Sequence, residues 1–211
     1  MLNPLEVLLR DWPKPYLTDT DIVINLRSSV DSRYSRVKRA LAASYLLPVR
    51  KGLYLIGEKL RGKSCPVNPY ELAVKIYAPS VVSLESALSY HGLIPEAVYT
   101  VSSVCVKRKK TYSTPVGQFS YQTVPPVSFY EEVERISDNN SEFFMAKPWR
   151  AICDYIYCNK LDWRTVAPLA QSLRIDVTQL PPLSEETRQA LMRYYKSKRI
   201  ILFLAGVKDE H

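Results

Sequence analysis

The chain has 211 residues, of which 46% are hydrophobic, and carries a formal net charge of +8 at pH 7. This length and apolar content allow a full buried core, exclude a disordered or low-complexity protein, and leave room for one domain or two modest ones. We expect two. Residues 1–68 hold 12 Lys and Arg against 6 Asp and Glu, so most of the positive excess lies in the first third of the chain. Such an excess indicates a polyanionic partner.

Membrane insertion and secretion are not expected. Glu6 and Arg10 interrupt any apolar run that could serve as a signal peptide. The apolar stretch at 200–206 is far shorter than the roughly 20 residues that a membrane span needs. The four cysteines form no CxxC pair, and His91 and His211 offer no zinc-ligand spacing. We therefore expect a soluble, cytoplasmic protein with reduced thiols, without membrane association, metal or cofactor.

Two helices are predicted in the first 26 residues. The first covers 3–11, where Asn3 can act as the N-cap and Pro4 occupies the first helical position. Two further prolines end this helix shortly after it, because proline removes a backbone donor and clashes with the preceding turn. A second helix is predicted from Thr18 to about Leu26, because the Thr18 side chain can cap it and acidic residues follow in its first turn.

The third predicted helix carries the main functional prediction. It runs from a cap at Asp31 or Ser32 to about Tyr45. At 100° per residue its larger apolar residues form one stripe, which we expect to pack inward. The residues of this stripe are Tyr34, Val37, Leu41 and Tyr45, flanked by Ala40 and Ser44. The opposite face holds the small and basic residues Ser32, Ser35, Arg36, Arg39 and Ala43. Such a face can lie in the major groove of DNA.

Residues 46–56 predict a hairpin of two short apolar strands, in which Gly52 supplies the positive φ of the turn. Three helices followed by a hairpin are typical of a winged helix-turn-helix. A lone basic helix is more often a solvated surface, but its neighbouring helices and hairpin favour DNA binding. We expect Arg36 and Arg39 to read bases, and the charged residues of the hairpin turn to reach the backbone or the minor groove. The predicted DNA-binding residues are Ser32, Arg33, Ser35, Arg36, Lys38, Arg39, Arg50 and Lys51.

Residues 57–69 have the composition of a linker, with two glycines and two prolines. They divide the chain into a predicted domain at 1–62 and a second at 70–211. The second domain should mix helices and strands, so the predicted fold class is α+β: an N-terminal winged helix-turn-helix followed by a larger mixed α/β domain. Its predicted helices lie at 70–77, 83–92, 149–159, 164–173 and 184–207, and its predicted strands at 99–107, 117–124 and 143–145.

No catalytic motif stands out in the second domain. His91 is the only internal histidine, and its place beside Gly92 at a helix end is better explained by the helix dipole, packing and a left-handed cap than by acid–base chemistry. The basic run 107–110 is expected to form a solvated loop, with an auxiliary phosphate contact as the alternative. The apolar spacing over 149–157 indicates a core stripe. Phosphate-loop, dinucleotide and metalloprotease signatures are absent, so we expect no enzymatic activity.

The set Arg50-Lys51-Gly52-Leu53-Tyr54, followed by SLESALSYHGLIPE at 83–96, resembles the AbiEi-type antitoxins of bacterial type IV toxin–antitoxin systems. The predicted strands over 99–108 and 117–121 and the helix over 148–157 match the later order of that family. The resemblance therefore covers nearly the whole chain. Where the family's later helix usually shows an acidic-basic pair, this chain has Ala146-Lys147-Pro148-Trp149-Arg150.

The resemblance implies a division of labour between the two domains. In that family the winged helix binds inverted repeats in the operon's promoter and represses transcription, while the larger domain is needed to counter a nucleotidyltransferase-like toxin. By resemblance, the recognition helix would be 32–44 and the wing 50–54. Two alternatives stay open: a protein-interaction adaptor that uses the winged-helix domain as a docking surface without binding DNA, and a nucleic-acid-modifying enzyme with an unrecognised site in the second domain.

Overall fold

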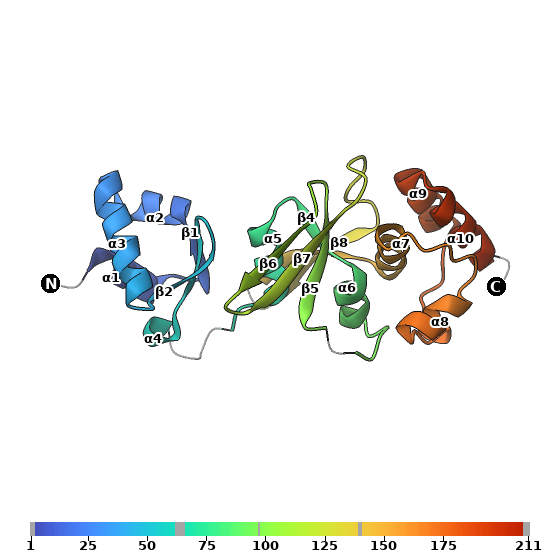
Figure 1. Cartoon of the computed structure of the whole chain (residues 1–211), viewed down its shortest axis with the longest axis horizontal. Helices are drawn as coiled ribbons and strands as arrows, with labels where there is room; N and C mark the ends of the chain where they lie inside the picture. The colour runs from blue at the N-terminus through green and yellow to red at the C-terminus, as the bar shows by residue number, and fades with distance from the viewer. Residues whose placement is uncertain (1–2, 62–65, 97, 139–140, 209–211) are drawn as a thin grey trace. The chain divides into compact units, whose positions relative to one another are not determined.

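A computed structural model describes residues 3–61, 66–96, 98–138 and 141–208. It confirms the α+β class and divides the chain into two compact units (Figure 1). One unit is Met1–Ile76 with Ser113–Val116, and the other is Tyr77–Tyr112 with Gly117–His211. Within the described ranges, every helix is too short or too polar to cross a lipid bilayer.

The N-terminal unit combines helices with a three-stranded sheet in the order β1-β3-β2. Both strand pairs are antiparallel, with Leu17 opposite Tyr54 and Leu47 opposite Leu55. The predicted helices near 3–11 and 18–26 and the predicted hairpin are confirmed, whereas the three-residue strand β1 is too short for its alternation to have been recognised. The elements are α1 (Pro4–Asp11), β1 (Tyr16–Thr18), α2 (Asp19–Leu26), α3 (Val30–Ala42), β2 (Leu46–Arg50), β3 (Leu53–Ile56), α4 (Glu58–Arg61) and α5 (Pro69–Ile76).

Side-chain caps fix where these helices begin. Asn3 Oδ1 accepts a hydrogen bond from Leu5 N at 3.1 Å. At the start of α2, Thr18 Oγ1 accepts from Asp21 N at 3.2 Å while Asp21 Oδ2 accepts from Thr18 N at 2.7 Å, which completes a reciprocal capping box. Both caps satisfy backbone N–H groups that have no partner inside the helix. The predictions of Asn3 and Thr18 as caps are therefore confirmed.

The core of this unit lies between α1, α2, α3 and the sheet. Apolar side chains from every one of these elements meet in it, and burial of their surface is the main force that holds the helices on the sheet. Val37 and Leu41 on α3 and Tyr45 just after it pack against this core, as their spacing predicted. Its buried members are Leu5, Leu9, Leu17, Ile22, Ala40, Leu46 and Ile56.

Helix α3 differs from its prediction at both ends. Its N-cap is Ser29, whose Oγ accepts from Ser32 N at 3.4 Å, and not Asp31 or Ser32. The helix ends at Ala42, three residues early, because Ser44 adopts a left-handed conformation with φ +58° and the chain turns into β2.

Tyr34 was expected to pack inward with the apolar stripe, and this was wrong, since its side chain is 71% exposed. The α3 residues that contact the core, Val37, Ala40 and Leu41, all lie in the second half of the helix. The first half of α3 extends beyond the core, so Val30 and Tyr34 have no core to pack against.

The first residues of the expected linker at 57–69 form a helix. Helix α4 occupies Glu58–Arg61, and Leu60 packs against the core of the N-terminal unit. Just before it, Gly57 N donates to Tyr45 O at 2.9 Å, and an added Cβ on Gly57 would lie only 2.1 Å from Ser44 O. The close approach of the two backbones therefore requires glycine here.

The C-terminal unit is built on a six-stranded sheet in the order β6-β7-β5-β4-β9-β8. Strand β5 is parallel to β7 and antiparallel to β4, while β4 is parallel to β9 and β9 is antiparallel to β8. The elements are β4 (Ser80–Val82), α6 (Leu84–Tyr90), β5 (Thr100–Cys105), β6 (Lys110–Thr114), β7 (Gly117–Thr123), β8 (Val133–Asp138), β9 (Ser141–Ala146), α7 (Pro148–Cys158), α8 (Ala167–Leu173), the 3₁₀ helix η2 (Val177–Gln179), α9 (Glu185–Tyr195) and α10 (Lys198–Lys208).

Helix α7 lies between the sheet and the C-terminal helices, packing against α6 and α10 (Figure 1). The predicted apolar stripe of this helix is confirmed at Trp149, Ile152, Cys153 and Ile156, which are buried, whereas Tyr157, also expected in it, is half-buried. The single helix expected at 184–207 was wrong. It is divided into α9 and α10 at Lys196, whose φ of +48° caps α9 in the left-handed conformation.

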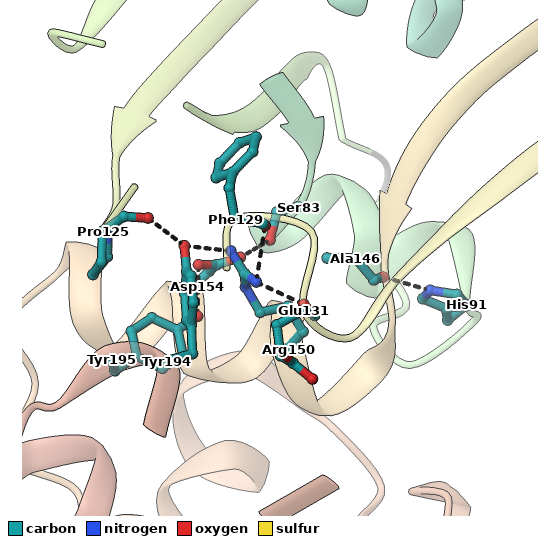
Figure 2. Close-up of polar contacts among 10 residues, drawn as sticks. All are labelled: Ser83, His91, Pro125, Phe129, Glu131, Ala146, Arg150, Asp154, Tyr194 and Tyr195. Carbon is teal, nitrogen blue, oxygen red and sulfur yellow. Dashed lines mark hydrogen bonds and ion pairs between the residues drawn. The ribbon is translucent and has the colours of Figure 1, made fainter. Parts of the chain in front are cut away.

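A buried ion pair on α7 forms the polar centre of the C-terminal unit (Figure 2). Arg150 and Asp154 are both 0% exposed, and Arg150 Nε donates to Asp154 Oδ2 at 3.0 Å. The remaining guanidinium nitrogens donate to Glu131 O at 2.7 Å and to Tyr194 Oη at 2.8 Å. The carboxylate of Asp154 also accepts from Ser83 Oγ and Tyr195 Oη, each at 2.6 Å. Every charge in the pair is thus matched by several partners.

This arrangement keeps Arg150 charged and the hydroxyl of Tyr195 protonated. Burial alone would lower the pKa of Arg150, but the charge of Asp154, the two tyrosines and the hydrogen bond to Asp154 together outweigh it and raise that pKa above its ordinary value. Burial, followed by the charge of Asp154, raises the pKa of Tyr195 well above 10, so its hydroxyl remains a donor. The guanidinium also lies 4.0 Å from the centre of the Tyr194 ring, a cation–π contact.

Replacing Arg150 by Met should destabilise the protein by about 3–5 kcal/mol, because it leaves the Asp154 carboxylate buried without its counter-ion. The matched control is Arg135→Met, which removes an exposed pair with Glu142 and should cost about 0–1 kcal/mol. Urea unfolding followed by circular dichroism measures both. Equal losses in the two variants would contradict the assigned importance of the buried pair.

Gly57→Ala should lower the free energy of unfolding by about 3 kcal/mol, since the new methyl group must displace backbone in a packed interior. Gly92→Ala provides the comparison, because an added Cβ there meets nothing within 4 Å and only its left-handed φ of +71° is penalised, at about 1–2 kcal/mol. Thermal unfolding of each variant gives the values. A smaller loss for Gly57→Ala than for Gly92→Ala would show that the close approach is absent.

Candidate nucleic-acid interface

Six of the eight predicted DNA-binding residues lie on α3, and the structure leaves all six at least partly accessible. Ser35, Lys38 and Arg39 are exposed, whereas Ser32, Arg33 and Arg36 are half-buried at the edges of the helix. The small side chains Ser35 and Ala42 are exposed on the same helix, so its outer face carries no bulky side chain at these two positions. A helix with such a face can approach another surface closely.

The two arginines expected to read bases differ in their surroundings. Arg39 Nε donates to Ser35 O, one turn earlier on α3, at 3.3 Å, and this bond directs the side chain along the helix. Arg36 makes no ion pair or hydrogen bond through its side chain with any residue that the structure describes. Arg39 is exposed and Arg36 is half-buried, so both guanidinium groups keep nitrogens that can donate to an external acceptor.

The side chain of Arg33 makes a hydrogen bond within the N-terminal unit. Its Nη1 donates to Ser28 O, in the turn that precedes α3. The side chain therefore bends back along the helix and stabilises the α2–α3 turn, while it stays half-buried. Its first role in this geometry is to hold the start of α3.

The hairpin turn presents Arg50 and Lys51, both exposed. Arg50 is engaged within the unit, because its Nη1 donates to Lys51 O at 2.9 Å and its Nη2 donates to Lys75 O at 3.2 Å. Lys51 makes no such contact with the described residues. Lys51 is therefore the freer of the two to meet a phosphate group.

The same turn is fastened to the start of α2. Asp19 N donates to Gly52 O at 3.0 Å, and the φ of +76° at Gly52 confirms the predicted left-handed turn. Burial, together with a hydrogen bond to Asp19 and its charge, raises the pKa of Tyr54 to about 12, so the tyrosine stays neutral and donates to that carboxylate. These contacts tie the hairpin to the start of α2.

Two basic residues near α3 were missed by sequence reasoning. Arg27 is exposed in the turn between α2 and α3, where its φ of +44° ends α2. Lys59 Nζ donates to Ala43 O at the end of α3 at 3.3 Å, from the segment expected to be a linker. The position of Arg27 between two predicted helices was a usable signal, whereas the contact of Lys59 depends on a fold that the sequence does not display.

Groups in the C-terminal unit offer a weaker basis for chemistry. His91 Nε2 lies 2.9 Å from Ala146 O, and because a carbonyl only accepts, this nitrogen carries the proton (Figure 2). Its nearest carboxylate oxygen, on Glu134, is 3.7 Å away.

The basic run 107–110 is exposed throughout, as expected, although Lys110 already belongs to β6. Among the described residues, no group of His, Cys, Asp and Glu is arranged to hold a metal ion.

No model of a known protein family matches the chain, and a search of curated proteins finds no match. Function must therefore be inferred from the chain's own side chains. The exposed basic face of α3 is the arrangement in the N-terminal unit that has an evident chemical use, because it presents guanidinium donors and small hydroxyls on a rigid element.

Thr18→Ala should reduce the stability of the N-terminal unit by about 0.5–2 kcal/mol, because it removes one half of the capping box of α2. Ser29→Ala should cost less, since its bond to Ser32 N is already long at 3.4 Å. Chemical unfolding of both variants measures the difference. A larger effect at Ser29 would mean that the start of α3, and not the capping box, limits stability.

Proposed function

We propose that the N-terminal unit is a winged helix-turn-helix that binds double-stranded DNA through α3. The order α1-β1-α2-α3-β2-β3, with a hairpin completing a three-stranded sheet, supports this proposal. In such modules the second helix of the pair enters the major groove, which is about 12 Å wide and admits one α-helix. In this proposal, α3 is the helix that enters the major groove.

The observation that carries the proposal is the outer face of α3. Arg39 and the small side chain of Ser35 are exposed on it, and Arg36, one turn before Arg39, is half-buried at its edge. Guanidinium groups bond bidentately to the O6 and N7 atoms of guanine, which is the commonest specific contact between proteins and DNA. The 13 residues of α3 span about 20 Å at 1.5 Å per residue, which suffices to reach several base pairs.

Other basic side chains would supply the phosphate contacts. Lys38 on α3, Arg27 before it and Lys51 at the hairpin turn are all exposed. Their charges neutralise phosphates without reading sequence, and the counterions they release make binding salt-dependent. Ser32 and Arg33 at the start of α3 are close to the positive end of the helix dipole, which also favours a phosphate.

The wider role follows from the resemblance to AbiEi-type antitoxins. We infer that the DNA is the promoter of the chain's own operon, with inverted repeats, and that binding represses transcription. The C-terminal unit would then be needed to counter a nucleotidyltransferase-like toxin, by contact or indirectly. In this proposal the protein acts without enzymatic activity and without a cofactor.

Fluorescence anisotropy with a labelled duplex from the region upstream of the gene tests DNA binding. We expect the affinity to fall linearly with salt on a log–log scale, and Arg36→Ala and Arg39→Ala each to cost about 1–3 kcal/mol of binding energy. Lys51→Ala should weaken all sequences alike and reduce the salt slope by about 1. Arg10→Ala, at the exposed end of α1, removes the same charge in the same unit and should have little effect.

A binding curve insensitive to salt, or full binding by the α3 variants, would favour the adaptor alternative instead. The antitoxin role has its own test: co-expression of the chain with a nucleotidyltransferase-like protein encoded directly downstream should restore growth. The Arg36→Ala and Arg39→Ala variants should still protect, since the C-terminal unit is unchanged in them. Failure to protect would refute the antitoxin role and leave DNA binding intact.

A further inference from the structure

The C-terminal unit contains a recess of about 360 Å³ into which three basic side chains face from separate parts of the chain. Lys109 comes from the segment between β5 and β6, Lys160 follows α7, and Arg199 lies in the first turn of α10. Gln122 and Thr123 at the end of β7 and Tyr157 on α7 complete most of its lining. No acidic residue belongs to that lining.

The positive charge of this recess is largely uncompensated. Lys109 and Lys160 form no ion pair with any residue in the described ranges. Arg199 pairs with Asp162 through its Nε at 2.9 Å, in a pair whose side chains are 42% and 67% exposed and which water therefore screens. This pair leaves the two Nη nitrogens of Arg199 to donate elsewhere. The recess thus combines the ammonium groups of Lys109 and Lys160 with the two Nη nitrogens of Arg199.

The other residues that line the recess are uncharged, and one of them, Tyr157, can pack against a ring of the ligand. Burial raises the pKa of the Cys158 thiol, which adds no negative charge to the recess. The ring of Tyr157 lies 5.3 Å from that of the buried Tyr195, which supports it from the core side. The Gln122 amide can both donate and accept, whereas Thr123 Oγ1 donates to Lys107 O at 2.8 Å and offers its lone pairs.

We propose that this recess binds a phosphorylated small molecule of nucleotide size. The phosphate groups lie among Lys109, Lys160 and Arg199, because ammonium and guanidinium donors match phosphate oxygens in charge and geometry. The ring of the ligand rests against Tyr157. A nucleotide is favoured over a nucleic-acid strand because the site is concave and its volume is within the range of small-molecule pockets, about 300–1,000 Å³.

This site is independent of the proposed DNA interface. None of its residues belongs to the N-terminal unit, and none contributes to the predicted DNA contacts. It also assigns a use to Lys109, part of the basic run 107–110 that the sequence left as a solvated loop. The ligand would bind whether or not α3 recognises DNA.

Isothermal titration calorimetry on the full chain tests the proposal with ADP, inorganic phosphate and adenosine. We expect one site for ADP, weaker binding of phosphate, and no measurable binding of adenosine. The double variant Lys109→Gln/Lys160→Gln should weaken ADP binding at least tenfold. The charge-matched control Arg135→Gln/Arg174→Gln removes two cations of the same unit that pair with Glu142 and Glu96, and should bind ADP as the unchanged chain does.

Tyr157→Leu separates the two parts of the site, since it should weaken ADP binding more than phosphate binding. Thermal unfolding verifies that each variant is folded, and the exposed lysine variants should retain the original midpoint. Absence of saturable ADP and phosphate binding would overturn the proposal, as would an equal loss in the control variant. Binding of a single-stranded octanucleotide that ADP fails to displace would also overturn it, in favour of a nucleic-acid site.

Discussion

The C-terminal unit depends on one buried ion pair. Arg150 and Asp154 stand one turn apart on α7, completely removed from water, and their hydrogen bonds reach Ser83 before α6, Tyr194 and Tyr195 on α9, and the backbone between β7 and β8. A charge is expensive to bury unless all its partners are in place. The pair therefore forms only when sheet, α7 and C-terminal helices are assembled together, and it selects that assembly over looser packings.

Local signals in the sequence predicted much of the fold. The caps at Asn3 and Thr18 and the turn at Gly52 depend on residues at most three positions away, so their chemistry is visible in the sequence itself. The partners of the buried ion pair are not visible in this way, because they are distant in sequence. Ser83 lies 71 positions from Asp154, and Tyr194 lies 44 positions from Arg150. Periodicity marked α7 as a core helix but could not indicate that an arginine on it would be buried.

The candidate nucleic-acid interface could likewise be predicted only in part. The exposure of Ser35 and Arg39 followed from helical spacing, and the structure agrees with it. The hydrogen bonds of Arg33 to Ser28 O and of Arg50 to Lys75 O could not be foreseen, because they depend on how a side chain bends or on which helix lies beside a turn. Tyr34 shows the related limit of a helical wheel, which gives the direction of a side chain but not how far along the helix the core extends.

The hydrogen bond between Asp19 N and Gly52 O limits the insertions that the hairpin can accept. Many hairpins tolerate insertions at their tips because the tip touches nothing else. Here the tip serves as an acceptor for the first residue of α2, so a longer loop would move that carbonyl away and release the helix start. Because the donor is the backbone N–H, no side-chain replacement at position 19 restores this bond, and an extended hairpin is compatible with it only if the Gly52 carbonyl keeps its place.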